Sequence, residues 1–286
     1  MRDGTNDGLI PDRTAVEGGL TALPRRFGRN AGSYFGDTID IAAVLQEIST
    51  AALAAGWTAS PFETDDQLII SAWIRRAARV SARLYLSAGI HGDEPAGPLA
   101  VRRLMQENPW PDDVEIWVCP CLNPTGFPLN RRENIHGRDL NRQYLHLEAS
   151  EVRAHVAWLN EQPRFDLCLC LHEDWEANGF YLYELNPDGR ASHADAIIEA
   201  VGKVCPVDTA PIIEGRPALG GIIRPSADPA SRPQWPEAFY LLTHKSRQTY
   251  TLEAPSDFGV DVRVTALVEA VRAVIRLGIA PGSSAS

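Results

Sequence analysis

The sequence predicts an α/β fold built around a mostly parallel sheet. Apolar runs rich in β-branched residues alternate with segments in which apolar residues recur at helical spacing, which is the pattern of strand–helix–strand units. At 286 residues, the chain is long enough to bury a large core and still fold as one unit. We therefore expect a single domain over residues 1–286, with an irregular arm at 1–30 and a disordered tail at 279–286.

The expected elements alternate along the first half of the chain. Ile41, Leu45 and Ile48 recur at helical spacing and predict an amphipathic helix over residues 37–55. Short apolar runs then predict strands, and the periodic segments between them predict helices that pack back over the sheet. The predicted strands cover residues 67–73, 82–90 and 114–122, and the predicted helices cover 94–106 and 148–160.

The second half continues this alternation on both sides of one irregular segment. Strands are expected over residues 165–171, 180–185 and 250–252, and helices over 192–204 and 261–277, the last with Asp261 near its N-cap. The residues between Cys205 and Tyr240 include many prolines, which favour an ordered loop over regular structure. A loop of this length is often functional.

Composition and charge exclude several classes of function. A net charge of −10 and an isoelectric point near 5.2 oppose non-specific binding to nucleic acid or anionic membrane, because both depend on clustered Lys and Arg. No apolar run approaches the roughly 20 residues that span a bilayer, and the N-terminus lacks the apolar core of a secretory signal. Five cysteines without paired spacing fit free thiols. We therefore expect a cytoplasmic protein with a small or peptidic substrate.

Polar residues follow four of the apolar runs at the point where each run ends. His91 and Glu94 follow LYLSAGI, and Asn123 follows EIWVCPCL. His172 follows FDLCLCL, and Glu253 follows TYTL. Because ligands bind at the carboxyl ends of strands in open α/β sheets, we expect these groups to converge at one edge of the sheet. Neither core packing nor solvation requires that convergence.

His91, Glu94 and His172 predict a site for one zinc ion. Catalytic zinc is commonly held by two His and a carboxylate, with a further position for water. The two-residue gap lets His91 and Glu94 reach one ion from a single turn, and His172 closes the site from another strand. Glu253 is the candidate base for a water molecule whose pKa the ion lowers from 15.7 toward roughly 7. The HxxE spacing alone is weak, because a hydrogen-bonded His and a solvated Glu would also produce it.

The loop NPTGFPLNRRENIHGRDLNRQY supplies the second group of motifs, and without them its arginines would indicate a solvated basic face. HGDE, NPTG, the RxNxxGxDLNR pattern from Arg132 to Arg142, LHED and TLEAP occur in this order over about Leu84 to Ser256. Together they resemble the M14 family of zinc carboxypeptidases, above all its compact bacterial members, including those that trim cell-wall peptides. The resemblance implies a mixed sheet of about eight strands between helices, and a metallopeptidase that hydrolyses a C-terminal peptide bond.

The resemblance also assigns catalytic roles. His91, Glu94 and His172 match the family's zinc ligands, and Glu253 matches its general base. Arg132 matches the arginine that polarises the scissile carbonyl and stabilises the oxyanion.

A further pair matches the family's substrate-binding residues. Asn141 and Arg142 match the residues that bind the terminal carboxylate of a substrate, for which a guanidinium is well suited. The family's mobile tyrosine is expected near Ser231, where no tyrosine stands. Tyr240 is the candidate substitute, although its apolar neighbours also fit a core position.

Several neighbouring residues keep open interpretations. Glu173 and Asp174 either orient a histidine ligand as hydrogen-bond acceptors or face solvent. Arg131 and Arg138 receive no role, and Arg224 is a candidate for a specificity pocket that nothing in the sequence places.

The pattern of the cysteines is more typical of buried thiols than of a second metal site. Cys119 and Cys121, and then Cys168 and Cys170, alternate along two strands, so that each pair is expected on one face. Neither pair has the spacing of structural zinc sites, and free Cys is commonly buried. We therefore predict four buried thiols.

Two other functions remain open at the level of the sequence. A deacylase of N-acyl amino acids, of the aspartoacylase and succinylglutamate desuccinylase type, shares the HxxE motif and the distant His. The TLE strand and the full arginine loop favour the peptidase. A catalytically silent module that retains zinc is the other alternative, and Glu253 and Arg132 argue against it. In each case the ligand is a peptide or an acylated amino acid with a free carboxylate.

Overall fold

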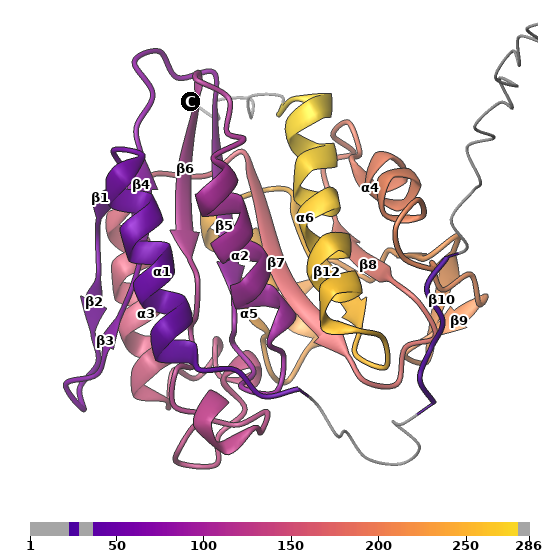
Figure 1. Cartoon of the computed structure of the whole chain (residues 1–286), viewed down its shortest axis with the longest axis horizontal. Coiled ribbons are helices and arrows are strands. Elements are labelled where there is room, and N and C mark those ends of the chain that lie inside the picture. Colours follow the sequence, from indigo (N-terminus) through magenta and orange to yellow (C-terminus); the bar gives the residue numbers. More distant parts are fainter. Residues whose placement is uncertain (1–22, 29–36, 280–286) are drawn as a thin grey trace, which may run out of the picture.

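A ten-stranded sheet runs through residues 23–28 and 37–279, which are the residues that this computed structural model describes (Figure 1). The predicted terminal arm and tail lie almost entirely outside these residues. In spatial order the strands are β1 (Thr58–Ala59), β4 (Trp73–Arg75), β6 (Val114–Cys119), β5 (Ala82–Ala88), β7 (Leu167–Asp174), β12 (Thr249–Pro255), β8 (Tyr181–Leu185), β11 (Ile222–Ile223), β10 (Arg216–Leu219) and β9 (Ile212–Ile213). The predicted α/β class with flanking helices is therefore confirmed.

The sheet is parallel at its centre, and outside the centre all pairs except β8 with β11 are antiparallel. Strands β6, β5, β7 and β12 run in one direction, so their carboxyl ends meet at the same edge. The described sheet has ten strands rather than about eight, because the proline-rich segment contributes β9, β10 and β11 instead of remaining a loop. These strands lie at an edge of the sheet, where a proline such as Pro217 in β10 removes fewer ladder hydrogen bonds.

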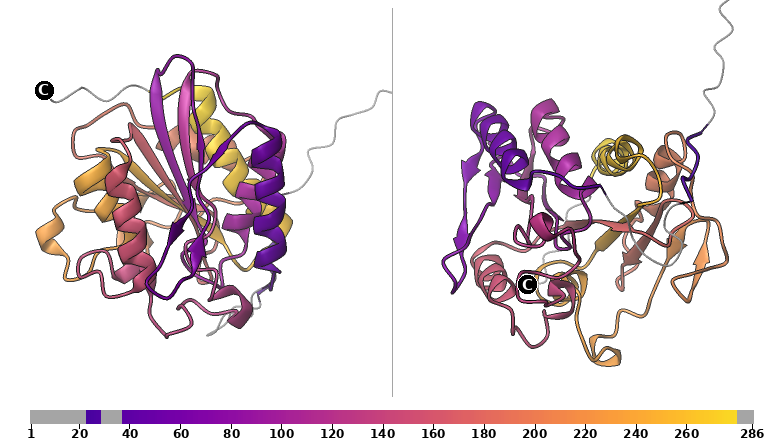
Figure 2. Two further views of the ribbon diagram at one scale, coloured as in Figure 1. Left: turned by 90° about the vertical axis from the view of Figure 1, so that its left-hand side faces the viewer. Right: turned by 60° about the horizontal axis from the view of Figure 1, so that its bottom comes forward.

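Helices cover both faces of the sheet (Figure 2). Helices α1 (Ile41–Ala54), α2 (Ala96–Glu107), α4 (Ala194–Val201) and α6 (Val260–Leu277) bury one face. Helix α3 (Ser150–Glu161) and the short α5 (Glu237–Tyr240), which continues into a π-helical turn over Leu241–Lys245, bury the other. Leu84 and Tyr85 of β5 illustrate the consequence, because they point into opposite cores and make the strand apolar throughout.

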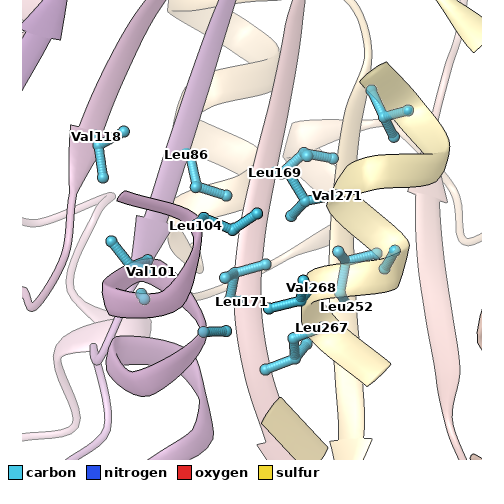
Figure 3. Close-up of a cluster of buried hydrophobic side chains, with 14 of the residues drawn as sticks. Leu86, Val101, Leu104, Val118, Leu169, Leu171, Leu252, Leu267, Val268 and Val271 are labelled. Carbon is cyan, nitrogen blue, oxygen red and sulfur yellow. The ribbon is translucent and has the colours of Figure 1, made fainter. Parts of the chain in front are cut away.

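The larger core lies between the sheet and helices α2 and α6 (Figure 3). Leu86, Leu169 and Leu252 come from three adjacent strands and are fully buried. Leu104 of α2 and Val271 of α6 cover them from above the sheet. This packing holds the central strands rigidly and so fixes the edge at which they end.

Two local predictions were wrong in detail. The strand expected over residues 67–73 is divided between β4 and β3 (Ile69–Ile70), which pairs with β2 (Phe62–Glu63) in a separate hairpin. Helix α2 begins at Ala96, so Glu94 lies in the preceding turn rather than in the helix. The last helix, α6, has Gly259 as its N-cap and Asp261 in its first turn, so Asp261 lies near the N-cap as predicted. None of the described helices is long and apolar enough to cross a membrane.

Candidate active site

The three predicted metal ligands lie together at the carboxyl edge of the central strands. His91 follows β5, Glu94 lies in the turn before α2, and His172 is part of β7. Glu94 Oε1 lies 2.5 Å from His91 Nδ1, and Glu94 Oε2 lies 3.0 Å from His172 Nδ1. All three side chains are buried. One donor atom from each lies within 4.8 Å of the other two, which is close enough for all three to contact one ion.

A tight backbone contact fixes the turn that carries two of these residues. A Cβ atom on Gly92 would lie 2.2 Å from the carbonyl carbon of Gly126, so only glycine fits at position 92. Gly126 is itself held by Asn123, whose Oδ1 accepts a hydrogen bond from its N–H at 3.0 Å. Asn123, expected among the polar groups at this edge, therefore supports the site by joining two of its loops.

The charges of the cluster suit a divalent cation. Burial disfavours ionisation of Glu94, but His91 and His172 outweigh it and hold the pKa of this carboxyl well below its usual range. Burial also opposes protonation of His91, yet Glu94 and Asp139 raise its pKa. Two imidazole nitrogens and an ionised carboxylate this close together form the donor set of catalytic zinc. The residues present therefore fit such an ion.

Asp139 is a site residue that the sequence reasoning missed. Its Oδ1 lies 3.4 Å from His91 Nε2 and caps the 3₁₀ turn η2 (Leu140–Arg142) by accepting from Asn141 N–H at 2.9 Å. Its Oδ2 accepts a hydrogen bond from Arg132 Nε at 2.8 Å. Asp139 belongs to the GRDLNR motif, and its position between two assigned residues was the available signal. It orients both a candidate ligand and a candidate catalytic arginine.

Arg132 reaches toward the cluster from the loop after β6. Its Nη1 lies 3.3 Å from His91 Nδ1 and 3.8 Å from Glu94 Oε1. Burial disfavours the guanidinium charge, but Glu94 and Asp139 outweigh this and raise its pKa. Arg132 is therefore a fixed cation beside the point where the ion would lie.

Glu253 lies beside the cluster because the sheet register puts it there. In the parallel pairing of β12 with β7, Glu253 is the partner of His172. Burial raises the pKa of Glu253 to about 8, with Glu94 and Asp174 adding to the effect and His172 and Arg132 opposing it. A carboxyl group with a raised pKa holds a proton more tightly than an exposed glutamate does, so its ionised form is the stronger proton acceptor.

Asn141 and Arg142 stand at the wall of the same pocket, in η2. Asn141 is buried, and its Oδ1 accepts a hydrogen bond from Glu237 N–H at 2.9 Å, so its amide NH₂ is the part left to bind a ligand. Arg142 is exposed at the pocket, with Nη1 donating to the carbonyl of Asn141 at 2.9 Å. The pocket encloses about 600 Å³, enough for a substrate residue and its neighbour.

Tyr240 is not brought to this pocket. It lies in the core between α5 and α3, where its hydroxyl donates to Asn160 Oδ1 at 2.9 Å and its ring packs against Tyr144 and His244. The apolar neighbours in the sequence were therefore the better guide to its position. The pocket is lined by Tyr181 and Tyr183 of β8, and neither comes from the loop before the last strand.

Glu173 and Asp174, the two residues after His172, make their hydrogen bonds away from the histidine ligands. Glu173 is buried against Arg263, to which it is ion-paired at 2.5 Å, and it also accepts from Ala96 N–H at the start of α2. Asp174 accepts hydrogen bonds from Tyr181 Oη at 3.1 Å and from Glu176 N–H. Their hydrogen bonds thus go to Ala96, Ser256, Arg263, Tyr181 and Glu176 and not to a histidine ligand.

The remaining basic residues of interest lie away from the metal ligands. Arg138 is paired with Glu148 at the surface, and Arg131 donates to the carbonyl of Asn134. Arg224 is paired with Glu184 at 2.8 Å outside the 600 Å³ pocket.

The cysteines are buried free thiols, as predicted, although Cys119 and Cys121 point into different cores because β6 ends at Cys119. Burial raises the pKa of Cys119, Cys121, Cys168 and Cys170. Among the described residues, the group of three or more potential ligands close enough to share an ion is His91, Glu94 and His172.

Comparison with known proteins agrees with the fold and the motifs. Residues 81–206 match the succinylglutamate desuccinylase/aspartoacylase catalytic domain. Carboxypeptidase SOL1 of Arabidopsis thaliana is 31% identical over 104 residues, which make up 29% of this chain and 21% of that protein. The chain thus matches about a fifth of the length of this curated relative.

Solved structures show the same fold. A candidate metallopeptidase from Shewanella amazonensis superposes with a TM-score of 0.73 at 21% identity, covering 85% of this chain and 94% of the other. A metallo-carboxypeptidase from Burkholderia cenocepacia has a TM-score of 0.62 at 15% identity, covering 81% and 67%. The resemblance to metallocarboxypeptidases predicted from the motifs is confirmed by the shared fold and by the motif-bearing segment that these comparisons match.

Proposed function

We propose that the chain is a zinc-dependent, carboxypeptidase-like hydrolase that cleaves an amide bond next to a free terminal carboxylate. One observation carries the proposal: the His91–Glu94–His172 cluster, the carboxyl of Glu253 and the Asn141–Arg142 pair all line a single pocket. When bound by His91, Glu94 and His172, zinc would lower the pKa of a water molecule and polarise the scissile carbonyl.

The protein's own residues account for the remaining parts of the reaction. Asn141 and Arg142 bind the terminal carboxylate through the amide NH₂ and the guanidinium, which places the last amide bond near the metal ligands. Glu253 takes the proton of the attacking water on its carboxylate and delivers it to the nitrogen of the leaving amine. Arg132 donates to the carbonyl oxygen as negative charge develops there, and Asp139 holds the guanidinium in place from behind.

The carboxyl of Glu253 beside the metal ligands favours a hydrolase over a protein that only binds its ligand. A binding module needs no proton acceptor beside the metal ligands, yet the sheet register pairs Glu253 with His172. A carboxyl whose pKa is raised by burial is costly to maintain, and such groups cluster at catalytic sites. We therefore favour an enzyme over a catalytically silent zinc-binding module.

A deacylase of N-acyl amino acids is the second candidate, and the match of residues 81–206 to the desuccinylase/aspartoacylase catalytic domain favours it. Both reactions cleave an amide bond whose nitrogen belongs to a residue with a free carboxylate. They differ in whether the acyl side is a peptide or a small acid.

One assay separates these functions. The purified, zinc-loaded protein is incubated with peptides that have free C-termini and with N-acyl amino acids, with Glu253→Gln as the control. Cleavage of peptides alone supports the carboxypeptidase, and cleavage of N-acyl amino acids alone supports the deacylase. Zinc binding without turnover on either panel supports the binding module. Metal analysis that finds no zinc would remove the basis of all three.

Residence in the cytoplasm, where the five free thiols would stay reduced, is part of the same proposal.

A further inference from the structure

Glu173 is a buried carboxylate on the face of the sheet that helices α2 and α6 cover. It follows His172 in β7, and because side chains alternate along a strand it points the opposite way, into the core that contains Leu171. Both helices lie over that core (Figure 3). The side chain of Glu173 has an exposed fraction of 0%, so its oxygens depend on donors from the protein.

The carboxylate of Glu173 accepts hydrogen bonds from three other segments of the chain. Its Oε1 accepts from Ala96 N–H, at the start of α2, at 2.5 Å. Its Oε2 accepts from Arg263 Nη1 of α6 at 2.5 Å and from Ser256 Oγ, directly after β12, at 3.2 Å. One carboxylate therefore joins α2, α6 and the end of β12 to the strand β7.

Three of the four segments joined at this point also carry residues of the active site. The contacts of the carboxylate lie within three residues, along the chain, of Glu94 before α2, His172 in β7 and Glu253 in β12. A movement of the turn before α2 relative to the two strands would break these buried contacts. The separation between the elements that carry the site is thus tied to Glu173.

Helix α2 depends on this contact because its own N-cap residue offers no cap. That residue is Pro95, and no side chain within the helix start makes a capping hydrogen bond. A carboxylate is a favourable neighbour of a helix N-terminus, since it opposes the positive end of the helix dipole. Glu173 therefore caps α2 from another element and fixes the turn that carries Glu94.

Arg263 completes the buried pair from α6, and stability alone does not explain it. Its side chain has an exposed fraction of 0%, and its Nη2 is also paired with Asp37, before α1. Burying two charges costs their hydration, and well-packed apolar residues often stabilise a core as well or better. The helix dipole also disfavours a cation near the amino end of α6. What the ion pair adds over an apolar pair is directional contacts, which fix relative positions.

We propose that Glu173 and Arg263 are positioning residues of the metal site. Their ion pair holds the turn before α2 at a fixed separation from β7 and β12, which presents Glu94 and His172 in the arrangement that binds zinc tightly. Both residues act through the elements that they join and not by contact with the ion. The inference rests on the zinc site of the proposed function, but not on which bond the enzyme cleaves.

Zinc affinity is the first test of this inference. In Glu173→Gln the amide oxygen can still accept from Ala96 N–H, but the amide nitrogen faces the donors of Arg263 and Ser256, so the contacts with α6 and β12 are lost. Competition with a chelator should show zinc binding that is roughly 10- to 100-fold weaker than in the wild type, the usual cost of changing residues behind metal ligands.

Cobalt(II) bound in place of zinc gives a second readout, because its visible absorption bands depend on coordination geometry. Glu173→Gln should change these bands, whereas a role in stability alone would leave them as they are. The matched control is Glu115→Gln, a buried carboxylate near the start of β6 that is paired with Arg83 at the end of the sheet opposite to the site. It should keep the zinc affinity and the cobalt bands of the wild type, even where urea unfolding shows a loss of stability.

A second variant is available if Glu173→Gln does not fold. Arg263→Lys keeps a buried cation, but one ammonium cannot contact Glu173 and Asp37 as two guanidinium nitrogens do, so zinc affinity should fall in the same way. Failure of both variants to fold would show that the pair serves the fold itself, and would overturn the inference.

The remaining outcomes separate this inference from the proposed function. Unchanged zinc affinity and unchanged cobalt bands in a folded Glu173→Gln overturn the positioning role while the hydrolase stands, and an equal loss in Glu115→Gln also overturns it. If the wild type cleaves neither peptides nor N-acyl amino acids but Glu173→Gln still binds zinc more weakly, the proposed function fails alone. A wild type that binds neither zinc nor cobalt overturns both.

Discussion

Glu253 and His172 are register partners on the adjacent parallel strands β12 and β7. Because neighbouring strands lie about 4.8 Å apart, the separation between the candidate base and a candidate metal ligand is set by the sheet and not by a loop. Both side chains also project from the same face, since partners in parallel register do so. The core beneath these strands therefore holds the geometry on which catalysis would depend.

Replacing Glu253 with Gln should lower kcat/KM by about 10²- to 10⁴-fold, since the amide cannot accept the proton of the attacking water. The zinc content should stay unchanged, because Glu253 is outside the ligand cluster. Steady-state kinetics and metal analysis on the same preparation measure both. The control is Glu199→Gln on the exposed face of α4, and unchanged turnover in Glu253→Gln would refute the base assignment.

The metal ligands predict a clear difference between two histidine variants. His172→Gln should lose most of the bound zinc, because one of three ligands is removed from a site whose geometry the sheet fixes. His146→Gln changes an exposed histidine in the loop after η2 and should retain about one zinc per chain. Metal analysis after dialysis, with circular dichroism to verify folding, gives the comparison. Full zinc content in His172→Gln would count against the cluster.

Arg132→Gln should lower kcat by about 10²- to 10³-fold with a smaller effect on KM, since its contact strengthens as charge develops on the carbonyl oxygen. Asp139→Asn should have a weaker effect in the same direction, because it loosens the Nε contact of 2.8 Å without removing the cation. Both are measured by full substrate-saturation curves. An effect of Arg132→Gln confined to KM would place this residue in substrate binding instead.

Arg142→Gln should raise KM by roughly 10- to 100-fold for peptides with a free C-terminus, as expected for loss of a charged hydrogen-bond partner. Peptides with an amidated C-terminus, which are expected to be poor substrates of the wild type, should be affected little by the change. The comparison of the two peptide series in wild type and variant is the test. An equal loss for both series would show that Arg142 acts on something other than the terminal carboxylate.

His155 provides a prediction about stability and pH that does not involve the metal ligands. It lies on the buried face of α3, with Nε2 2.9 Å from Tyr85 Oη and Nδ1 2.8 Å from Tyr144 Oη, and burial lowers its pKa to about 3. A depressed histidine pKa stabilises the fold above the unfolded value of 6.5, and this contribution is lost as the pH falls from 6.5 toward 3.

The size of this effect can be measured by urea unfolding. By pH 5, His155 should reduce the free energy of unfolding by about 2 kcal/mol relative to neutral pH. His155→Gln, whose amide can donate and accept, should show a shallower loss between pH 7 and pH 5, and the exposed His146→Gln should follow the wild type. Equal slopes in His155→Gln and wild type would contradict the buried, neutral state of this histidine.

The sequence by itself determined the class of the fold and which three residues form the candidate metal cluster. Strand and helix periodicities follow directly from which residues are apolar, so the central strands and all the long helices were predicted to within a few residues. His91, Glu94 and His172 could be grouped because each follows an apolar run, and parallel strands end at a common edge. That reasoning needs no knowledge of distances.

Tertiary structure decided which residues beyond that edge share the pocket. Tyr240 and Arg232 stand eight positions apart in the same proline-rich stretch, yet the first enters the core and the second the pocket. Prolines and the positive-φ turn at Glu214 set the path of this segment, and its contacts with Phe239 and the sheet edge are long-range. Arg216 and Arg232 of this segment line the pocket, whereas Arg224 is paired with Glu184 outside it. The local sequence pattern shows where apolar residues recur. The direction of a polar side chain, by contrast, depends on packing with residues far away in the sequence.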